Sequence, residues 1–136
     1  MIGWQKNETD ICIMEKRIAV FDDNDNRRDG LQMLISFTDG LMCCGCFPDC
    51  SNVLHDIETS KPEVVLMDID MPNVNGIEGV KIIRRKYPQL KVLMQTVFED
   101  DDKIFASICA GADGYILKKA PPHELLKAIN EVLDGG

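Results

Sequence analysis

The chain of 136 residues is 45% hydrophobic and 28% charged, which suits one globular domain and excludes a disordered chain. Fifteen Lys and Arg against 23 Asp and Glu leave a formal net charge of −8, which excludes this segment as a binder of nucleic-acid backbones. No apolar run is long enough to cross a bilayer, and the first residues lack the pattern of a signal peptide, so we expect a cytoplasmic protein without membrane contact.

The first residues are mostly polar and show no clear period. Met14 stands directly before the apolar segment with which the folded part begins. We therefore expect residues 1–16 to be an unstructured leader or a non-native extension, and residues 17–136 to form one domain.

Apolar runs and helical patterns then alternate five times. The apolar runs predict strands at 18–21, 41–47, 64–67, 91–95 and 115–118. The helical patterns predict helices at 26–37, 51–60, 76–87, 99–111 and 121–136. This alternation predicts an α/β fold, a doubly wound parallel sheet of five strands with helices on both faces.

The second predicted strand, LMCCGCF, is rich in cysteine. In a reducing compartment all six cysteines of the chain are expected to be thiols. The spacing of Cys43 and Cys46 also occurs in zinc sites. In a regular strand, however, Cys44 and Cys46 share one face while Cys43 points the other way, and the nearest histidine, His55, falls on the next helix. A cysteine-rich buried strand is the expectation, with a metal site as the alternative.

Polar side chains follow four of the five apolar runs. They are, in chain order, Asp22, Asp23, Asp68, Thr96 and Lys118. Ligands of open α/β sheets bind at the carboxyl ends of the strands, so these residues are the candidates for a site. If the first and third strands are neighbours, three carboxylates converge there, and a hard cation such as Mg²⁺ would offset their repulsion.

The candidates suit one reaction. A carboxylate beside Mg²⁺ can attack phosphorus and become an aspartyl phosphate if the charge of the phosphoryl group is neutralised. Asp68 is the candidate nucleophile, with Mg²⁺ on one phosphoryl oxygen. The ammonium of Lys118 can reach a second oxygen, and the hydroxyl of Thr96 can donate to a third. Each residue alone is more often a turn former, a cap or a solvated charge; their common position at strand ends favours a shared site.

From about Arg17 to Leu133 the chain resembles the receiver domain of two-component response regulators. The segments that carry the resemblance are VFDDND, VVLMDIDMPNVNG, LMQT and GADGYILKK. The resemblance implies a flavodoxin-like, CheY-like (βα)5 fold with strand order 2-1-3-4-5. The tail GADGYILKKAPPHELLKAINEVLDGG is similar to the NarL/FixJ subfamily, whose receivers precede a LuxR-type helix-turn-helix domain. Such a DNA-binding output domain would follow Gly136 and would provide the contact with DNA.

The resemblance also implies roles for the acidic residues. Asp68 would accept the phosphoryl group from a sensor histidine kinase, with Mg²⁺ as the cofactor. Asp23 would bind Mg²⁺ directly and Asp22 through water. Asp68 itself and the backbone carbonyl of Asp70 would be the other ligands.

Further roles follow from the resemblance at the later strands. Thr96 and Lys118 would hold phosphoryl oxygens, and Tyr115 matches the aromatic switch that turns inward when Thr96 moves; an ordinary half-buried aromatic is the alternative. Val97 stands where the family prefers a smaller residue. Lys119 stands where proline is common, and the peptide before it is expected to be cis, as in the family.

Two surfaces are implied as contacts with partners. Phosphorylation would shift the population of conformations of the face formed by the fourth helix, fifth strand and fifth helix, residues 99–135. That face would contact a second copy, as a homodimer, or the DNA-binding domain. The kinase would dock near residues 26–31 of the first helix.

Two other functions are left open. Asp68-Ile69-Asp70 matches the D-x-D motif of haloacid-dehalogenase-type phosphatases, but that motif normally follows the first strand, and the short chain leaves no room for a cap. A pseudo-receiver would keep the fold as a binding module without phosphorylation, although such proteins usually lose an acidic residue or the lysine. We expect a signalling domain, not an enzyme, that promotes only its own phosphorylation and dephosphorylation.

Overall fold

A computed structural model describes residues 15–97 and 99–135. The strands are β1 (Lys16–Phe21), β2 (Leu41–Phe47), β3 (Val64–Asp68), β4 (Lys91–Thr96) and β5 (Gly114–Leu117). The helices are α2 (Asp25–Ser36), α3 (Val53–Ser60), α4 (Gly76–Lys86), α5 (Asp101–Ala110) and α6 (Pro122–Leu133). Each matches a predicted element. The leader expected at 1–16 lies mostly outside the described residues.

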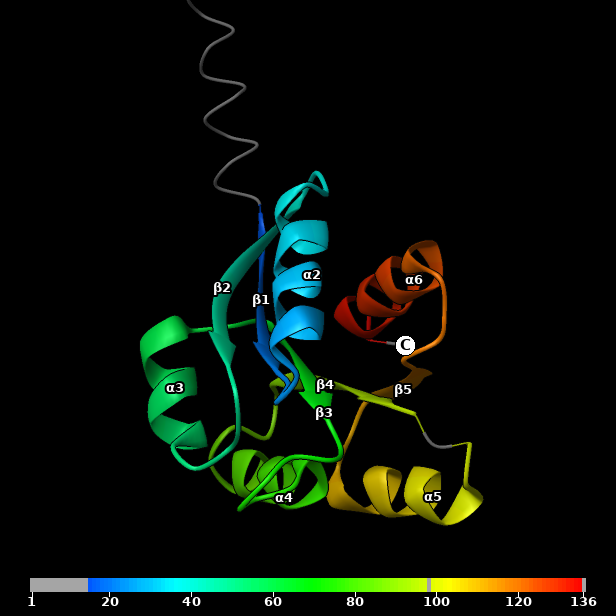
Figure 1. The fold of residues 1–136 in the computed structure, drawn as a ribbon. Helices are drawn as coiled ribbons and strands as arrows, with labels where there is room; N and C mark the ends of the chain where they lie inside the picture. Colours follow the sequence, from blue (N-terminus) through cyan, green and yellow to red (C-terminus); the bar gives the residue numbers. More distant parts are fainter. Residues whose placement is uncertain (1–14, 98, 136) are drawn as a thin grey trace, which may run out of the picture.

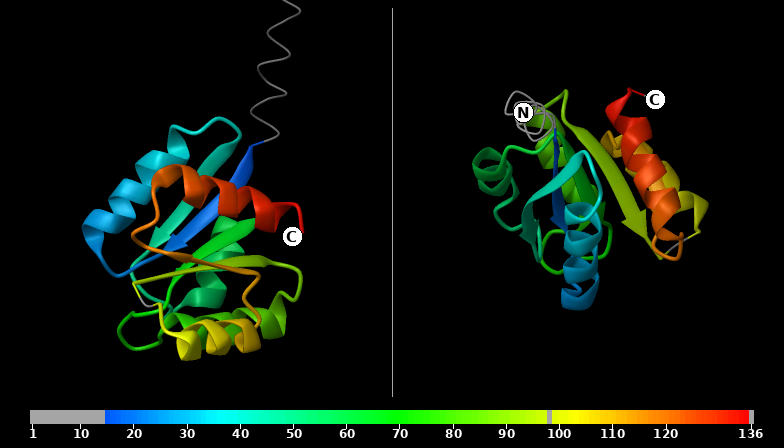
Figure 2. Two further views of the ribbon diagram at one scale, coloured as in Figure 1. Left: turned by 90° about the vertical axis from the view of Figure 1, so that its right-hand side faces the viewer. Right: turned by 90° about the horizontal axis from the view of Figure 1, so that it is seen from above.

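The five strands form one parallel sheet in the order β2-β1-β3-β4-β5, as predicted. Helices α2 and α6 cover one face of the sheet, and α3, α4 and α5 cover the other (Figures 1 and 2). The predicted (βα)5 fold is therefore confirmed. It places β1 beside β3, so the carboxyl ends of these two strands meet at one edge.

The two faces of the sheet carry separate apolar cores because side chains alternate along each strand. In β1, Ile18 and Val20 pack with α2 and α6, whereas Ala19 and Phe21 pack with the other three helices. All four side chains are fully buried. This explains why the central strands are continuous apolar runs rather than alternating ones.

A β-bulge interrupts β2 and corrects the prediction for its cysteines. Ile18 of β1 pairs with Cys43, but the next residue of β1 pairs with Gly45, so Cys44 is an extra residue without a partner on β1. Cys43 and Cys46 consequently pack on the α2 side of the sheet, and Cys44 packs on the opposite side. The expectation that Cys44 and Cys46 share a face was wrong, because it assumed unbroken alternation.

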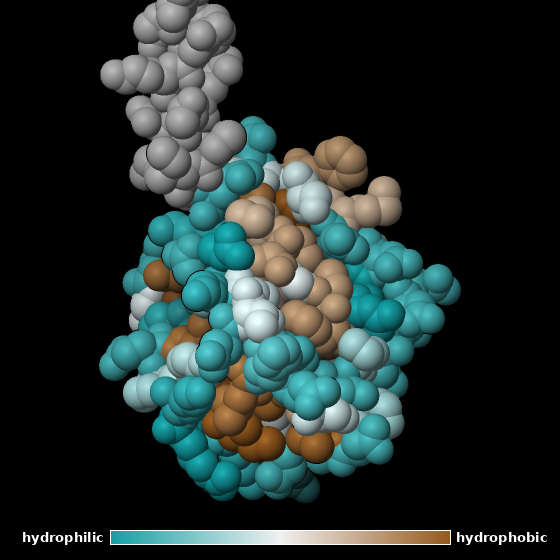
Figure 3. Space-filling model, turned by 90° about the vertical axis from the view of Figure 1, so that its left-hand side faces the viewer, coloured by the Kyte–Doolittle hydropathy of each residue, from teal (hydrophilic) through white to brown (hydrophobic). Residues whose placement is uncertain are grey.

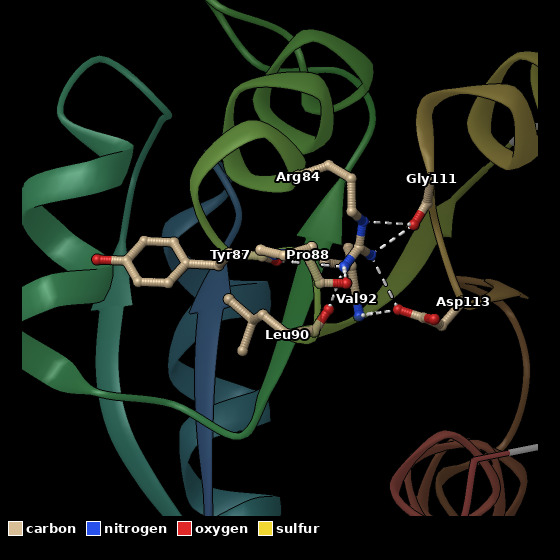
Figure 4. Close-up of polar contacts among 7 residues, drawn as sticks. All are labelled: Arg84, Tyr87, Pro88, Leu90, Val92, Gly111 and Asp113. Carbon is tan, nitrogen blue, oxygen red and sulfur yellow. Dashed lines mark hydrogen bonds and ion pairs between the residues drawn. The ribbon is translucent and has the colours of Figure 1, made fainter.

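Arg84 of α4 ties together three segments at the amino-terminal side of β4 (Figure 4). Its guanidinium group donates hydrogen bonds to the backbone carbonyl oxygens of Tyr87, Pro88, Leu90 and Gly111. It also lies 3.0 Å from Oδ2 of Asp113, which accepts a second hydrogen bond from the backbone N–H of Val92 at 2.8 Å. One side chain thus joins the end of α4, the start of β4 and the loop before β5.

A membrane-spanning helix was not expected, and none of the helices among the described residues is both long and apolar enough to cross a bilayer.

Candidate functional site

Three carboxylates meet at the carboxyl ends of β1 and β3. One oxygen from each of Asp22, Asp23 and Asp68 lies within 4.8 Å of the others. Asp22 and Asp68 are buried, with 0% and 2% of their surface exposed, whereas Asp23 is exposed. The predicted convergence of these residues is therefore present in the structure.

Two of these carboxylates, Asp23 and Asp68, open onto a cavity of about 360 Å³. Its lining residues are Asp23, Asn24, Asp68, Asp70, Val97 and Lys118. Asp70 follows the end of β3 and its side chain is exposed. Val97, which also lines this cavity, is 67% exposed. The cavity is thus mostly acidic, with one lysine.

Lys118 is the cation of the cavity. Its Nζ lies 3.0 Å from Oδ2 of Asp68 and 3.5 Å from Oδ2 of Asp22. Oδ2 of Asp68 is buried, and the contact with Lys118, an ion pair outside regular hydrogen-bond geometry, is its one close contact with a donor group in the described part of the chain. An oxygen that is buried, charged and short of donors suits a hard cation or an electrophile.

The environment of Asp68 disfavours its charge. Burial raises the pKa of the Asp68 carboxyl to about 7, the ammonium of Lys118 opposes that rise, and the neighbouring carboxylate of Asp22 adds to it. Two buried carboxylates and one ammonium leave an excess of negative charge. This excess is the physical reason for expecting a cation here.

Replacement of Asp68 by asparagine is expected to stabilise the metal-free fold at high pH. The pKa is about 7 in the folded state and near 3.8 in the unfolded chain, so the native protein holds more protons between these values, and wild-type stability falls as pH rises through this range. In Asp68→Asn this loss is absent. Urea unfolding in EDTA should give a gain on the order of a few kcal/mol at pH 8 that shrinks toward pH 4. A gain that is independent of pH would contradict the account.

Gln95 and Arg27 hold Asp22 in place, although neither was predicted to belong to the site. The side-chain amide of Gln95, on β4, donates to Oδ2 of Asp22 at 3.4 Å. Arg27 of α2 donates to Oε1 of Gln95 at 2.8 Å and to the backbone carbonyl of Lys118 at 3.1 Å. Gln95 could have been singled out from its position in an apolar strand. Such a residue is expected to be buried, as Gln95 is, and buried polar groups require partners.

Gly76 brings the start of α4 against the end of β3. A Cβ atom at this position would lie 2.0 Å from the backbone oxygen of Asp68 and 2.9 Å from Cα of Ile69. The backbone N–H of Gly76 donates to the carbonyl of Ile69 at 2.8 Å, and Asn75 caps the helix. Only glycine permits this approach. The pair Asn75-Gly76 directly before a helical pattern could have predicted this close approach.

Thr96 and Tyr115 lie on neighbouring strands beside the acidic residues. Thr96 is buried at the end of β4, and its side chain forms a hydrogen bond with Tyr115 of β5. Burial raises the pKa of Tyr115, and this hydrogen bond opposes the rise. The peptide between Lys118 and Lys119 is trans, as are all peptides among the described residues, so the expected cis peptide is wrong.

The comparisons with known proteins agree with the fold. The family model of the response regulator receiver domain matches residues 18–130. The chain therefore belongs to the response regulator receiver domain family, a class of signalling domain.

Two curated relatives are a transcriptional regulatory protein and a response regulator. The transcriptional regulatory protein LnrK of Bacillus subtilis is 36% identical over 120 residues, covering 88% of this chain and 54% of the relative. The response regulator GacA of Pseudomonas aeruginosa is 35% identical over 122 residues, covering 88% and 56%. This chain spans about half the length of these curated relatives.

Solved structures show the same fold. A LuxR-family two-component response regulator from Aurantimonas sp. SI85-9A1 has a TM-score of 0.84 at 29% identity, covering 89% of this chain and 86% of that one. A DNA-binding response regulator of the LuxR family from Staphylococcus aureus has a TM-score of 0.81 at 26% identity, covering 87% and 98%. The resemblance to the LuxR-type subfamily is confirmed.

Proposed function

We propose that this domain is a phosphoacceptor, in which Asp68 takes a phosphoryl group from a sensor histidine kinase in a Mg²⁺-dependent reaction. The observation that carries the proposal is the state of Oδ2 of Asp68. This oxygen is buried, its one close cation is the ammonium of Lys118 at 3.0 Å, and the carboxylates of Asp22 and Asp23 lie close to it.

Magnesium fits the donor set at this site. Asp22, Asp23 and Asp68 supply carboxylate oxygens, and the backbone carbonyl of Asp70 would add a neutral oxygen; these are hard ligands of the type that Mg²⁺ prefers. When bound, the ion would neutralise charge on the carboxylates and on the phosphoryl group. Gln95 would keep Asp22 oriented toward the ion through its hydrogen bond to Oδ2.

The transfer itself requires positioning and neutralised charge. A carboxylate oxygen of Asp68 forms the new bond to phosphorus while the bond from phosphorus to the kinase histidine breaks. The ammonium of Lys118, already beside Asp68, would move onto a phosphoryl oxygen. The hydroxyl of Thr96 would donate to another, which means giving up its present hydrogen bond with Tyr115.

The loss of that hydrogen bond would transmit phosphorylation to the face formed by α5, β5 and α6, residues 99–135. Tyr115 lines a cavity of about 620 Å³ between α5 with the segment before it, β5, and the start of α6 with the loop before it. Phe105 and Ile108, on α5, are 69% and 59% exposed. We propose that phosphorylation shifts the population of conformations of this face. A second copy or a DNA-binding domain of the full-length protein would contact it.

The kinase is proposed to dock on α2. A cavity of about 310 Å³ lies between this helix and the start of α6. Arg27, Gly30, Leu31 and Leu34 supply the lining from α2. An apolar groove of this kind suits a helical partner, which would bring a phosphohistidine to Asp68.

Intact mass spectrometry after incubation with acetyl phosphate tests the proposal. We expect one phosphoryl adduct per chain with Mg²⁺ and none in EDTA. Asp68→Asn should form no adduct, because it lacks the nucleophile. Asp70→Asn is the matched control, two residues away with an exposed side chain, and should still form the adduct.

Two results would contradict the proposal and would also identify the alternative. Absence of an adduct in the wild type with acetyl phosphate and with histidine kinases would indicate a phosphorylation-independent pseudo-receiver. Sustained release of phosphate from small phosphomonoesters would indicate a phosphatase.

A further inference from the structure

We propose that Cys43 and Cys46 form a redox site, a dithiol that hydroperoxides oxidise to an intrachain disulfide. The two Sγ atoms lie 3.4 Å apart, in hydrogen-bond contact. Both side chains are half-buried on β2, the edge strand of the sheet. The pair lies outside the acidic cavity and has no part in the phosphorylation proposed above.

The β-bulge makes the pairing possible. Cys43 is opposite Ile18 and Cys46 is opposite Val20, so four residues of β2 cover the distance that three residues of β1 cover. At about 3.3 Å per residue, two steps of β1 span roughly 6.6 Å. Disulfides accept Cα separations up to about 6.8 Å. In an unbroken strand the pair would be three steps apart, near 10 Å, and on opposite faces.

The environment distinguishes the roles of the two sulfurs. The hydrogen bond between the two sulfurs lowers the pKa of Cys43 to about 7, more than burial raises it. The Cys43 thiol can also donate to the carbonyl oxygen of Gly45, at 3.6 Å. The pKa of Cys46 is raised by the contact between the two sulfurs and by burial. Cys43 is therefore the thiolate that attacks, and Cys46 is the thiol that resolves.

The other described cysteines do not form such a dithiol pair. Cys44, between the two, packs on the opposite face of the sheet, and burial raises its pKa. Cys50 is buried against Met67, to whose sulfur its thiol donates at 3.4 Å. Cys109 is exposed on α5. The pair on β2 is thus chemically distinct from its neighbours.

The surroundings favour redox chemistry over metal binding. Within residues 15–97 and 99–135, the acids at the phosphoacceptor site are the one group of three or more His, Cys, Asp or Glu side chains close enough to hold an ion. Two sulfurs without a third ligand do not make a zinc site. Both thiols are partly accessible, and an apolar band crosses the face of the molecule that carries the edge strand β2 (Figure 3).

The oxidation proceeds in two balanced steps. The Cys43 thiolate attacks the terminal oxygen of the hydroperoxide, the O–O bond breaks, and the products are a sulfenic acid and an alkoxide or hydroxide. The Cys46 sulfur then attacks the Cys43 sulfur, the S–O bond breaks, and water leaves with the proton of the thiol. The two thiols lose two electrons, which the hydroperoxide takes up. A dithiol reductant reverses the change by exchange.

Thiol counting tests the proposal. The folded protein is treated with hydrogen peroxide, the peroxide is removed, and the chain is denatured and alkylated with N-ethylmaleimide before intact mass measurement. We expect loss of two of the six alkylatable thiols in a monomeric chain, with full recovery after dithiothreitol. Cys43→Ser and Cys46→Ser, or the alanine variants if serine impairs folding, should form no intrachain disulfide.

Cys44→Ser and Cys109→Ser are the matched controls. They remove a thiol adjacent to the pair and an exposed thiol elsewhere, and both should lose two thiols as the wild type does. The proposal is overturned if the folded wild type keeps all thiols, if Cys44→Ser abolishes the disulfide, or if the disulfide still forms in folded Cys43→Ser.

Discussion

Gly76→Ala is expected to lower the free energy of unfolding by about 3 kcal/mol or more. The added methyl group would lie 2.0 Å from the backbone oxygen of Asp68 and under 3.0 Å from two further backbone atoms, none of which can rotate away as a side chain can. Helix α4 would have to move off the end of β3. Because β3 ends in Asp68, the same shift should impair phosphorylation.

The matched control for this change is Gly30→Ala. Gly30 is exposed within α2, and a Cβ atom there would have no atom within 4 Å. Alanine in an open helical position stabilises by about 0.5 to 1 kcal/mol. Urea unfolding of the two variants should therefore move the midpoint in opposite directions. An unchanged midpoint for Gly76→Ala would contradict the close approach of α4 to β3.

Arg84→Met is expected to destabilise the fold by about 3 kcal/mol, since it removes a donor from partly buried carbonyl groups and leaves Asp113 without its ion-pair partner. The guanidinium group bonds to backbone carbonyls of the loop between α4 and β4, to that of Gly111 after α5, and to Asp113 (Figure 4). Methionine retains the apolar stem, so the difference reports the polar contacts. Hydrogen exchange should accelerate most at the start of β4 and in the loop before β5.

Arg85→Met provides the control, because Arg85 is the next residue of α4 and is exposed. Its replacement should change the free energy of unfolding by less than about 0.5 kcal/mol. Equal losses in the two variants would show that net charge, rather than the contacts of Arg84, is responsible.

The proximity of the site residues at the strand ends was predictable, because parallel strands place their carboxyl ends at one edge of the sheet. Asp22 and Asp68 are brought together by that rule alone, once β1 and β3 are neighbours. The positions of the strands followed from apolar runs that are too short for helices and are bounded by polar segments. These features depend on local patterns and on general rules of topology.

Contacts that depend on three-dimensional detail were not predictable. The bulge at Cys44 reverses the faces of the residues after it, and no turn residue or charge marks its position apart from Gly45. The role of Gln95 depends on Asp22 and Arg27, which lie far from it in the chain. The trans peptide before Lys119 departs from an expectation taken from relatives, where proline often stands at this position.

The most direct test of the central claim is to locate the phosphoryl group. After treatment with acetyl phosphate and Mg²⁺, borohydride reduces an aspartyl phosphate to homoserine, which peptide mass spectrometry can assign to one position. We predict homoserine at position 68 alone, dependent on Mg²⁺ and absent without acetyl phosphate. Homoserine at Asp22, Asp23 or Asp70 instead, or at no position although an adduct forms, would contradict the assignment of Asp68 as the phosphoacceptor.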